Sequence, residues 1–132
     1  MAEYRTSERS PHGRAEYLQW ARILSQGNPV HGMILVFVQK LCTALHEFAP
    51  AWENGLLEEE GLPYVRERLA ARTRTVLSGL EDNGLADVPI AADFRQLLAS
   101  IGGAQSMAEL ADLSEVVHEL GHATCDWLER AT

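Results

Sequence analysis

The stretch that decides the fold is residues 28–50, "NPVHGMILVFVQKLCTALHEFAP". Asn28 is a residue type that caps helices, and the proline that follows it suits a first helical position. The first half of the stretch is apolar on nearly every side, whereas the second half carries polar residues on one face. A helix that is apolar all round is a buried one, so the stretch predicts the central helix of a core. We expect it to end near residue 49, because Pro50 blocks continuation.

Four further helices are predicted from apolar residues at helical spacing and from start and stop signals. Their expected ranges are 11–26, 63–80, 90–101 and 106–130. The last begins at a capping box, Ser106 with Glu109, and is expected to run unbroken. In the first, the apolar residues at helical spacing are Tyr17, Leu18, Ala21 and Leu24. The segment between the second and third helices is expected to be a connector with one short helical turn.

No stretch alternates apolar and polar residues with period two, so no strand is predicted. The chain is predicted to be all-α, a single-domain helical bundle of four longer helices plus a short irregular helical element. Residues 1–10 are expected to form a flexible leader and residues 11–132 the bundle domain. A chain of 132 residues can close one hydrophobic core without disulfides.

The charge of the chain limits its partners. Its formal net charge is −8, which argues against direct binding of nucleic acid and suits a basic protein or a metal cation better. Of its eleven cationic side chains only Lys40 is lysine, a bias that predicts a GC-rich bacterial source.

Neither export nor membrane insertion is indicated. No apolar signal-peptide core is found near the start, and the longest apolar run, "MILVFV", is far shorter than a membrane span. Cys42 and Cys125 belong to no paired-cysteine motif, so they are expected to be free thiols. A reducing, cytoplasmic location is the default expectation.

The clearest chemical motif is "HELGH", residues 118–122. It matches the H-E-x-x-H pattern with which many metalloproteases hold zinc. Residues four apart share a helical face, so His118 and His122 could direct ring nitrogens at one ion, with Glu119 as general base on a metal-bound water. Such peptidases also need a third ligand and a substrate-aligning strand. Here residue 128, where one class has a histidine, is Leu128, and no strand is predicted.

Three interpretations of this segment stay open. A helical wheel places the two histidines away from the apolar seam, toward solvent or a partner. They could simply pair with neighbouring carboxylates, Glu115 with His118 and His122 with Asp126. They could bind metal together with Glu115, Asp126 or Cys125, at the surface or at a dimer interface. A ligand from an earlier helix, such as His46 or Glu47, would revive the hydrolase. The Glu-x-x-His spacing of di-iron bundles also occurs, but both copies lie on one helix.

Two other regions are candidates for contact with a partner. Gly32, Leu35, Val36 and Gln39 form one stripe of the central helix, which is either an exposed apolar patch or part of the core. Trp52 in the connector is a candidate anchor. Arg68 and Arg72 could clamp a carboxylate or phosphate, although a solvated face is the simpler interpretation.

Together these features predict a small acidic interaction module: an adaptor, regulatory subunit or inhibitor that docks on another protein, including a basic partner or a second copy of itself. No cofactor is expected for that role. The alternative is a zinc-dependent hydrolase that uses "HELGH".

Overall fold

The computed structural model describes the backbone of residues 11–131 and the side chains of residues 15–131. The predicted leader, residues 1–10, lies outside the described residues. Within them the chain is all-α, as predicted, with six α-helices and one short 3-10 helix. In chain order these are α2 (Pro11–Ser25), α3 (Pro29–Glu53), η1 (Glu59–Gly61), α4 (Leu62–Glu81), α5 (Pro89–Gly103), α6 (Met107–Asp112) and α7 (Ser114–Arg130).

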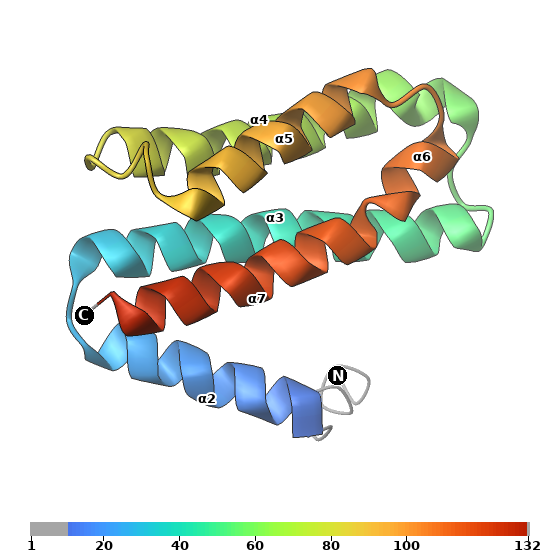
Figure 1. Ribbon diagram of the computed structural model, residues 1–132. Helices are drawn as coiled ribbons and strands as arrows, with labels where there is room; N and C mark the ends of the chain where they lie inside the picture. The colour runs from blue at the N-terminus through green and yellow to red at the C-terminus, as the bar shows by residue number, and fades with distance from the viewer. Residues whose placement is uncertain (1–10, 132) are drawn as a thin grey trace.

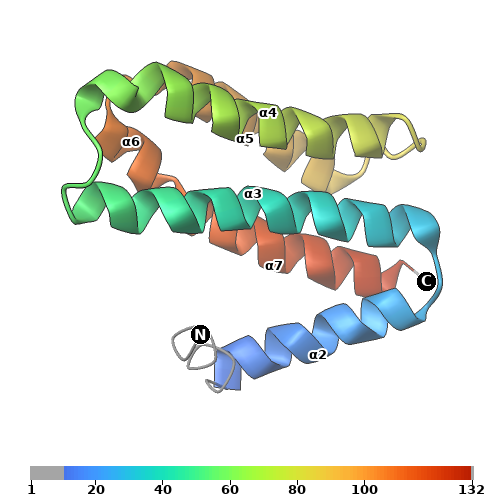
Figure 2. The ribbon, with the colours of Figure 1, turned by 180° about the vertical axis from the view of Figure 1, so that it is seen from behind.

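Four helices close a ring around the core. α3 contacts α4, α4 contacts α5, α5 contacts α7, and α7 returns to α3. Successive members of the ring run in opposite directions, as Figures 1 and 2 show. α2 lies outside the ring, along α7 and α3. The predicted bundle is therefore present, but α5 belongs to its ring while α2, of equal length, is an added outer helix.

α3 is the central helix, as expected. The side chain of Asn28 accepts hydrogen bonds from the backbone N–H groups of Val30 and His31, at 3.0 and 3.2 Å. Among the described helices, α3 alone is long and apolar enough to cross a membrane. It contacts α2, α4, α6 and α7, and eight of its side chains are buried.

The prediction that Pro50 ends this helix is wrong, because α3 continues to Glu53. A proline removes its own N–H donor, but its carbonyl still accepts, here from Asn54 N at 2.9 Å. Gly55, with a φ of 74°, then turns the chain away. Trp52 consequently lies on the last turn of α3 and not in a connector.

The predicted unbroken helix over 106–130 is also wrong. The backbone leaves the helical path at Leu113, where ψ is −4°, and separates α6 from α7. α6 has to cross from the end of α5 to the start of α7 (Figure 1), and it buries Met107 and Leu110 completely. Its start is fixed as the sequence predicts, because Ser106 Oγ accepts from Glu109 N at 3.2 Å. Burial of this short crossing segment overrides the continuous helical pattern.

Candidate metal centre between α2 and α7

Polar side chains hold α2 against α7. Gln19 Nε2 donates to Asp126 at 2.8 Å and to Glu129 at 3.1 Å. Arg22, one turn further along α2, forms an ion pair with Glu129, and this pair, with Gln19, lowers the pKa of the Glu129 carboxyl. These contacts fix how α2 lies along α7, and they place Glu16, one turn before Gln19, opposite the "HELGH" segment.

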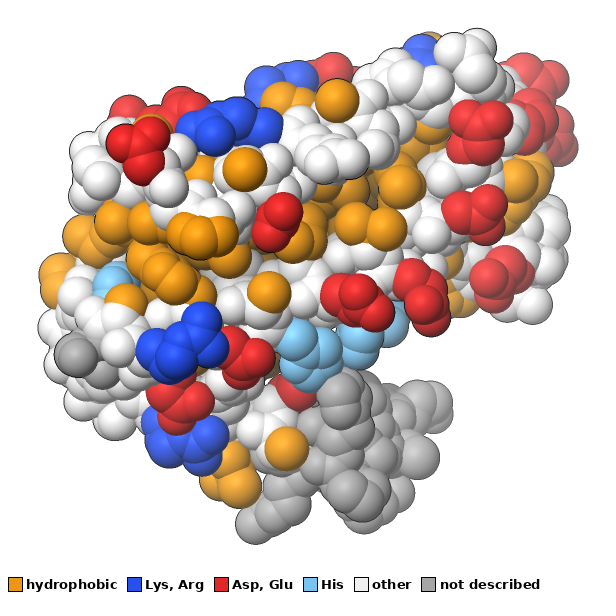
Figure 3. Space-filling model, viewed as in Figure 1, with side chains coloured by type: hydrophobic (Ala, Val, Ile, Leu, Met, Phe, Trp, Pro, Cys, Tyr) orange, Lys and Arg blue, Asp and Glu red, His pale blue; other side chains and the backbone are white. Residues whose placement is uncertain are grey.

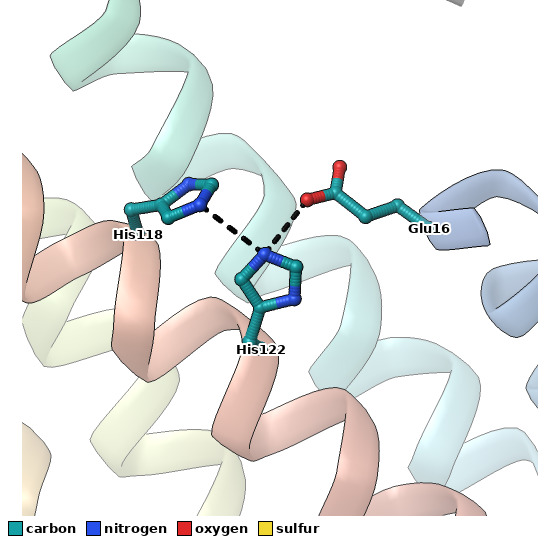
Figure 4. A group of neighbouring side chains, drawn as sticks. All are labelled: Glu16, His118 and His122. Carbon is teal, nitrogen blue, oxygen red and sulfur yellow. Dashed lines mark hydrogen bonds and ion pairs between the residues drawn. The ribbon is translucent and has the colours of Figure 1, made fainter. Parts of the chain in front are cut away.

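Glu16 and both histidines of the motif converge there (Figure 4). His122 Nε2 lies 2.9 Å from Glu16 Oε2 and 3.2 Å from His118 Nε2. The two imidazole rings stand nearly perpendicular, with centroids 4.6 Å apart. The three potential ligand atoms all lie within 4.8 Å of one another. Two elements from opposite ends of the chain thus bring two ring nitrogens and one carboxylate oxygen to one point.

The two contacts of His122 Nε2 compete with each other as hydrogen bonds. A histidine ring nitrogen carries either one hydrogen or one lone pair, directed in the ring plane. His122 Nε2 therefore cannot make well-aligned hydrogen bonds to Glu16 and His118 at the same time. A cation between the three atoms would accept a lone pair from each of them. The convergence has the form of a two-histidine, one-carboxylate metal centre.

The centre is partly exposed. His118 is exposed, while Glu16 and His122 are half-buried. In Figure 3, histidine side chains lie at the surface where α7 faces α2, with carboxylates beside them. An ion could reach this position without rearrangement of the core.

The glycine of the motif has a packing role. A Cβ atom on Gly121 would lie 3.2 Å from Cys42 Sγ on α3, a tight contact, so the absent side chain lets α7 approach α3 closely at this turn. With that side of α7 against α3, His118 and His122 are left on the side toward α2.

The two cysteines stay protonated in this region at neutral pH. Burial raises the pKa of Cys42 and that of Cys125 to about 11. Cys125 Sγ accepts a hydrogen bond from Trp20 Nε1 at 3.1 Å. The sequence had offered Cys125 as a third ligand. Its thiol is instead neutral and hydrogen-bonded to Trp20 of α2.

The other predicted ligands are placed elsewhere. Asp126 accepts from Gln19, and Glu115 is exposed and outside the converging group. Glu16 was missed because no motif marks it. The available signal was the polar spacing of Glu16, Gln19 and Arg22, three residues apart on one face of α2.

A groove of about 280 Å³ adjoins the centre at His118. α3 forms one wall and the start of α7 the other. Its polar lining includes His46, Glu53 and Glu115, and the apolar lining includes Leu45 and Val117. The exposed Glu119, the general base of the hydrolase interpretation, is not among these lining residues.

The predicted contact stripe on α3 is divided between core and surface. Leu35 is buried and Gly32 is half-buried, whereas Val36 (42% exposed) and Gln39 are at the surface. Trp52 is half-buried and lies against the core. Val36 and Gln39 line a second groove, between α3 and α4.

Neither the fold nor the centre can be interpreted through a relative. Comparison with protein-family models, with curated proteins and with solved structures found no match for this chain.

Proposed function

We propose that this protein binds one divalent transition-metal ion, with zinc as the expected ion, through Glu16, His118 and His122. The observation that supports the proposal is the convergence of three ligand atoms from two helices. A tetrahedral zinc ion about 2.1 Å from its ligands separates neighbouring ligand atoms by about 3.4 Å. The two separations from His122 Nε2, 3.2 Å to His118 and 2.9 Å to Glu16, need small outward movements to match this value. The third pair, His118 and Glu16, lies within 4.8 Å.

The types of ligand favour a transition metal over magnesium or calcium. Imidazole nitrogens suit zinc, copper, nickel and iron, whereas magnesium and calcium prefer a shell of oxygens. Three protein ligands leave a fourth position for water or another molecule, as in catalytic zinc sites. Copper and nickel are expected to compete for the same atoms, because both suit imidazole.

The ion would fasten α2 to α7. Glu16 belongs to the outer helix, and both histidines belong to the ring. An ion held by all three stabilises only the conformation in which α2 is docked, so metal affinity and docking are linked. The proposed role is therefore metal-dependent assembly of the outer helix on the bundle.

A second candidate function, zinc-dependent hydrolysis, is supported by the groove beside His118. A zinc-bound water has a pKa near 7, and the groove could hold a substrate near it. Glu119 is the candidate general base. With 4-nitrophenyl acetate as probe, zinc-dependent turnover lost in Glu119→Gln at unchanged zinc content would support hydrolysis. Absence of zinc-dependent turnover would remove this function and leave metal binding intact.

Metal binding is tested directly on protein purified without an affinity tag. We expect one zinc per chain by elemental analysis and calorimetry. Glu16→Ala, His118→Ala and His122→Ala should each weaken zinc binding by at least about tenfold. The matched control is His46→Ala, which removes an exposed histidine of the neighbouring groove.

Two outcomes would contradict the proposal. One is wild-type protein that binds no zinc, cobalt or nickel at micromolar concentration. The other is an equal loss of affinity in His46→Ala, which would indicate unspecific binding to surface histidines. If only the Glu16 variant kept full affinity, the ion would be held by α7 alone, and the proposed link to α2 would fail.

A further inference from the structure

A second groove lies between α3 and α4, which run side by side in Figure 2. Its volume is about 280 Å³. The α3 residues that line it, among them Val36, Lys40 and Glu47, are about a third of a turn away from those that line the groove beside His118. From α4 it receives Arg68 and Arg72. It is therefore a separate surface from the metal centre.

The cations of this groove differ from most others in the chain. Eight of the eleven cationic side chains are described. Arg66 and Arg95 donate to backbone carbonyls, and Arg22 and Arg74 bond glutamates. The other four form no ion pair or side-chain hydrogen bond with any described residue: Lys40, Arg68, Arg72 and Arg130. Three of these four line one groove.

This distribution is unusual in a chain with a net charge of −8. Arg72 is half-buried as a residue, and its guanidinium has no acceptor among the described residues. Arg68 and Arg72 are one helical turn apart, and Lys40 contributes from the opposite wall. Glu47 lines the groove as well, without forming an ion pair there. The groove offers donors that an anionic ligand would satisfy.

We propose that this groove binds a short acidic segment of a partner protein. The lining on α3 extends from Val36 to Glu47, about 16 Å of helix, which suits a peptide better than a small anion. Val36 and Ala44 give it an apolar floor for one side chain between the acidic ones. The sequence favoured a basic partner, whereas the contact proposed here is with an acidic one.

A short segment fits the charge of the whole chain better than a long polyanion does. At physiological salt, charges interact over about 8 Å. A peptide within the groove therefore meets mainly Lys40, Arg68 and Arg72. A nucleic acid extending beyond it would meet the acidic remainder of the surface.

The probe is a fluorescein-labelled peptide of about eight residues, rich in glutamate with one central leucine, which is long enough to cover the lining. Its anisotropy is measured against the full chain. Changing Lys40, Arg68 or Arg72 singly to glutamine should weaken binding about three- to tenfold, and Glu47→Gln should strengthen it. Arg130→Gln, which removes an unpaired cation outside the groove, should change affinity less than about twofold.

Three results would overturn the proposal. The first is no binding of the peptide at low salt. The second is an effect of Arg130→Gln equal to those of the groove variants, which would show unspecific charge attraction. The third is complete displacement by millimolar inorganic phosphate, with phosphate binding lost in the same variants, which would assign the groove to small oxyanions. Far-ultraviolet circular dichroism of each variant shows that the fold is retained.

Discussion

α2 and α5 are both 15-residue helices that begin with a proline, yet they are held in opposite ways. α5 buries five side chains in the core, among them Phe94 and Ile101 at no more than 1% exposure. In the described part of α2 only Ile23 is equally buried. The other described contacts of α2 include the polar ones that Gln19 and Arg22 make with α7 and the packing of Trp20 against the core. α5 is therefore part of the cooperative core, whereas α2 is attached by contacts that depend on charge and, as we propose, on metal.

The largest effect is expected in α5. Phe94→Ala removes a completely buried aromatic ring from the core, and such changes cost about 3–5 kcal/mol of unfolding free energy. Urea denaturation measures the loss. Leu18→Ala on α2, where the side chain is 42% exposed, should change stability by less than about 0.5 kcal/mol. A comparable loss in both variants would show that α2 is part of the same core.

Zinc binding should stabilise α2 more than α5. At a free concentration one hundred times its dissociation constant, an ion that binds only the docked state stabilises it by about 2.7 kcal/mol. Hydrogen exchange should therefore slow in α2 and at His118 to His122, whereas amides that open only with the α5 core should change less. His122→Ala should abolish the zinc effect. Equal protection of both helices in wild type would mean that α2 does not open independently.

Much of the fold could be predicted from the sequence, because helix starts and stops are local. The Asn28 cap forms as predicted, and so does the Ser106 half of the capping box, whereas Glu109 Oε1 accepts from Gln105 N at 2.8 Å and not from Ser106 N. The position of α2 could not be predicted in this way. Its apolar spacing singled out Tyr17 and Leu24, but these are 65% and 56% exposed, while Ile23 is buried. The side of a short helix that packs inward depends on the neighbouring surface, and here α7 offers acidic side chains.

Only the local part of the candidate centre could be predicted from the sequence. The i, i+4 spacing places His118 and His122 on one face whatever the tertiary structure is. Glu16 enters only through the packing of α2 on α7, which brings together residues from the two ends of the chain. The sequence left open a third ligand from an earlier helix, with His46 and Glu47 as examples. In the structure His46 lines the groove beside His118 and Glu47 lines the groove between α3 and α4.

A smaller effect is expected where α3 begins, beside the turn from α2. His31 is buried, and its Nδ1 is the one buried side-chain nitrogen or oxygen in the described part without a hydrogen-bond partner. Its ring lies 5.9 Å from that of Trp127. Because a buried unsatisfied group costs about 1–3 kcal/mol, His31→Leu should raise the unfolding free energy by about 1 kcal/mol. His46→Leu, at an exposed site, is the control, and a loss of stability in His31→Leu would contradict the argument.

The smallest expected effect is a difference in how the attachment of α2 and that of α5 respond to pH. Arg22 and Gln19 lower the pKa of Glu129 below its ordinary 4.5, so the carboxylate contributes stability above pH 4.5 that is lost as pH falls through the lower, folded value. Acidification should therefore loosen α2 first, which the indole N–H resonance of Trp20, bonded to Cys125, would report. Glu129→Gln should remove much of this pH dependence, and added salt should weaken it.

Glu81, whose carboxylate lies 3.8 Å from Arg95 of α5, provides the matched variant Glu81→Gln. If that variant altered the Trp20 titration as much as Glu129→Gln does, α2 and α5 would respond to charge as one unit, and the contrast between them would be lost.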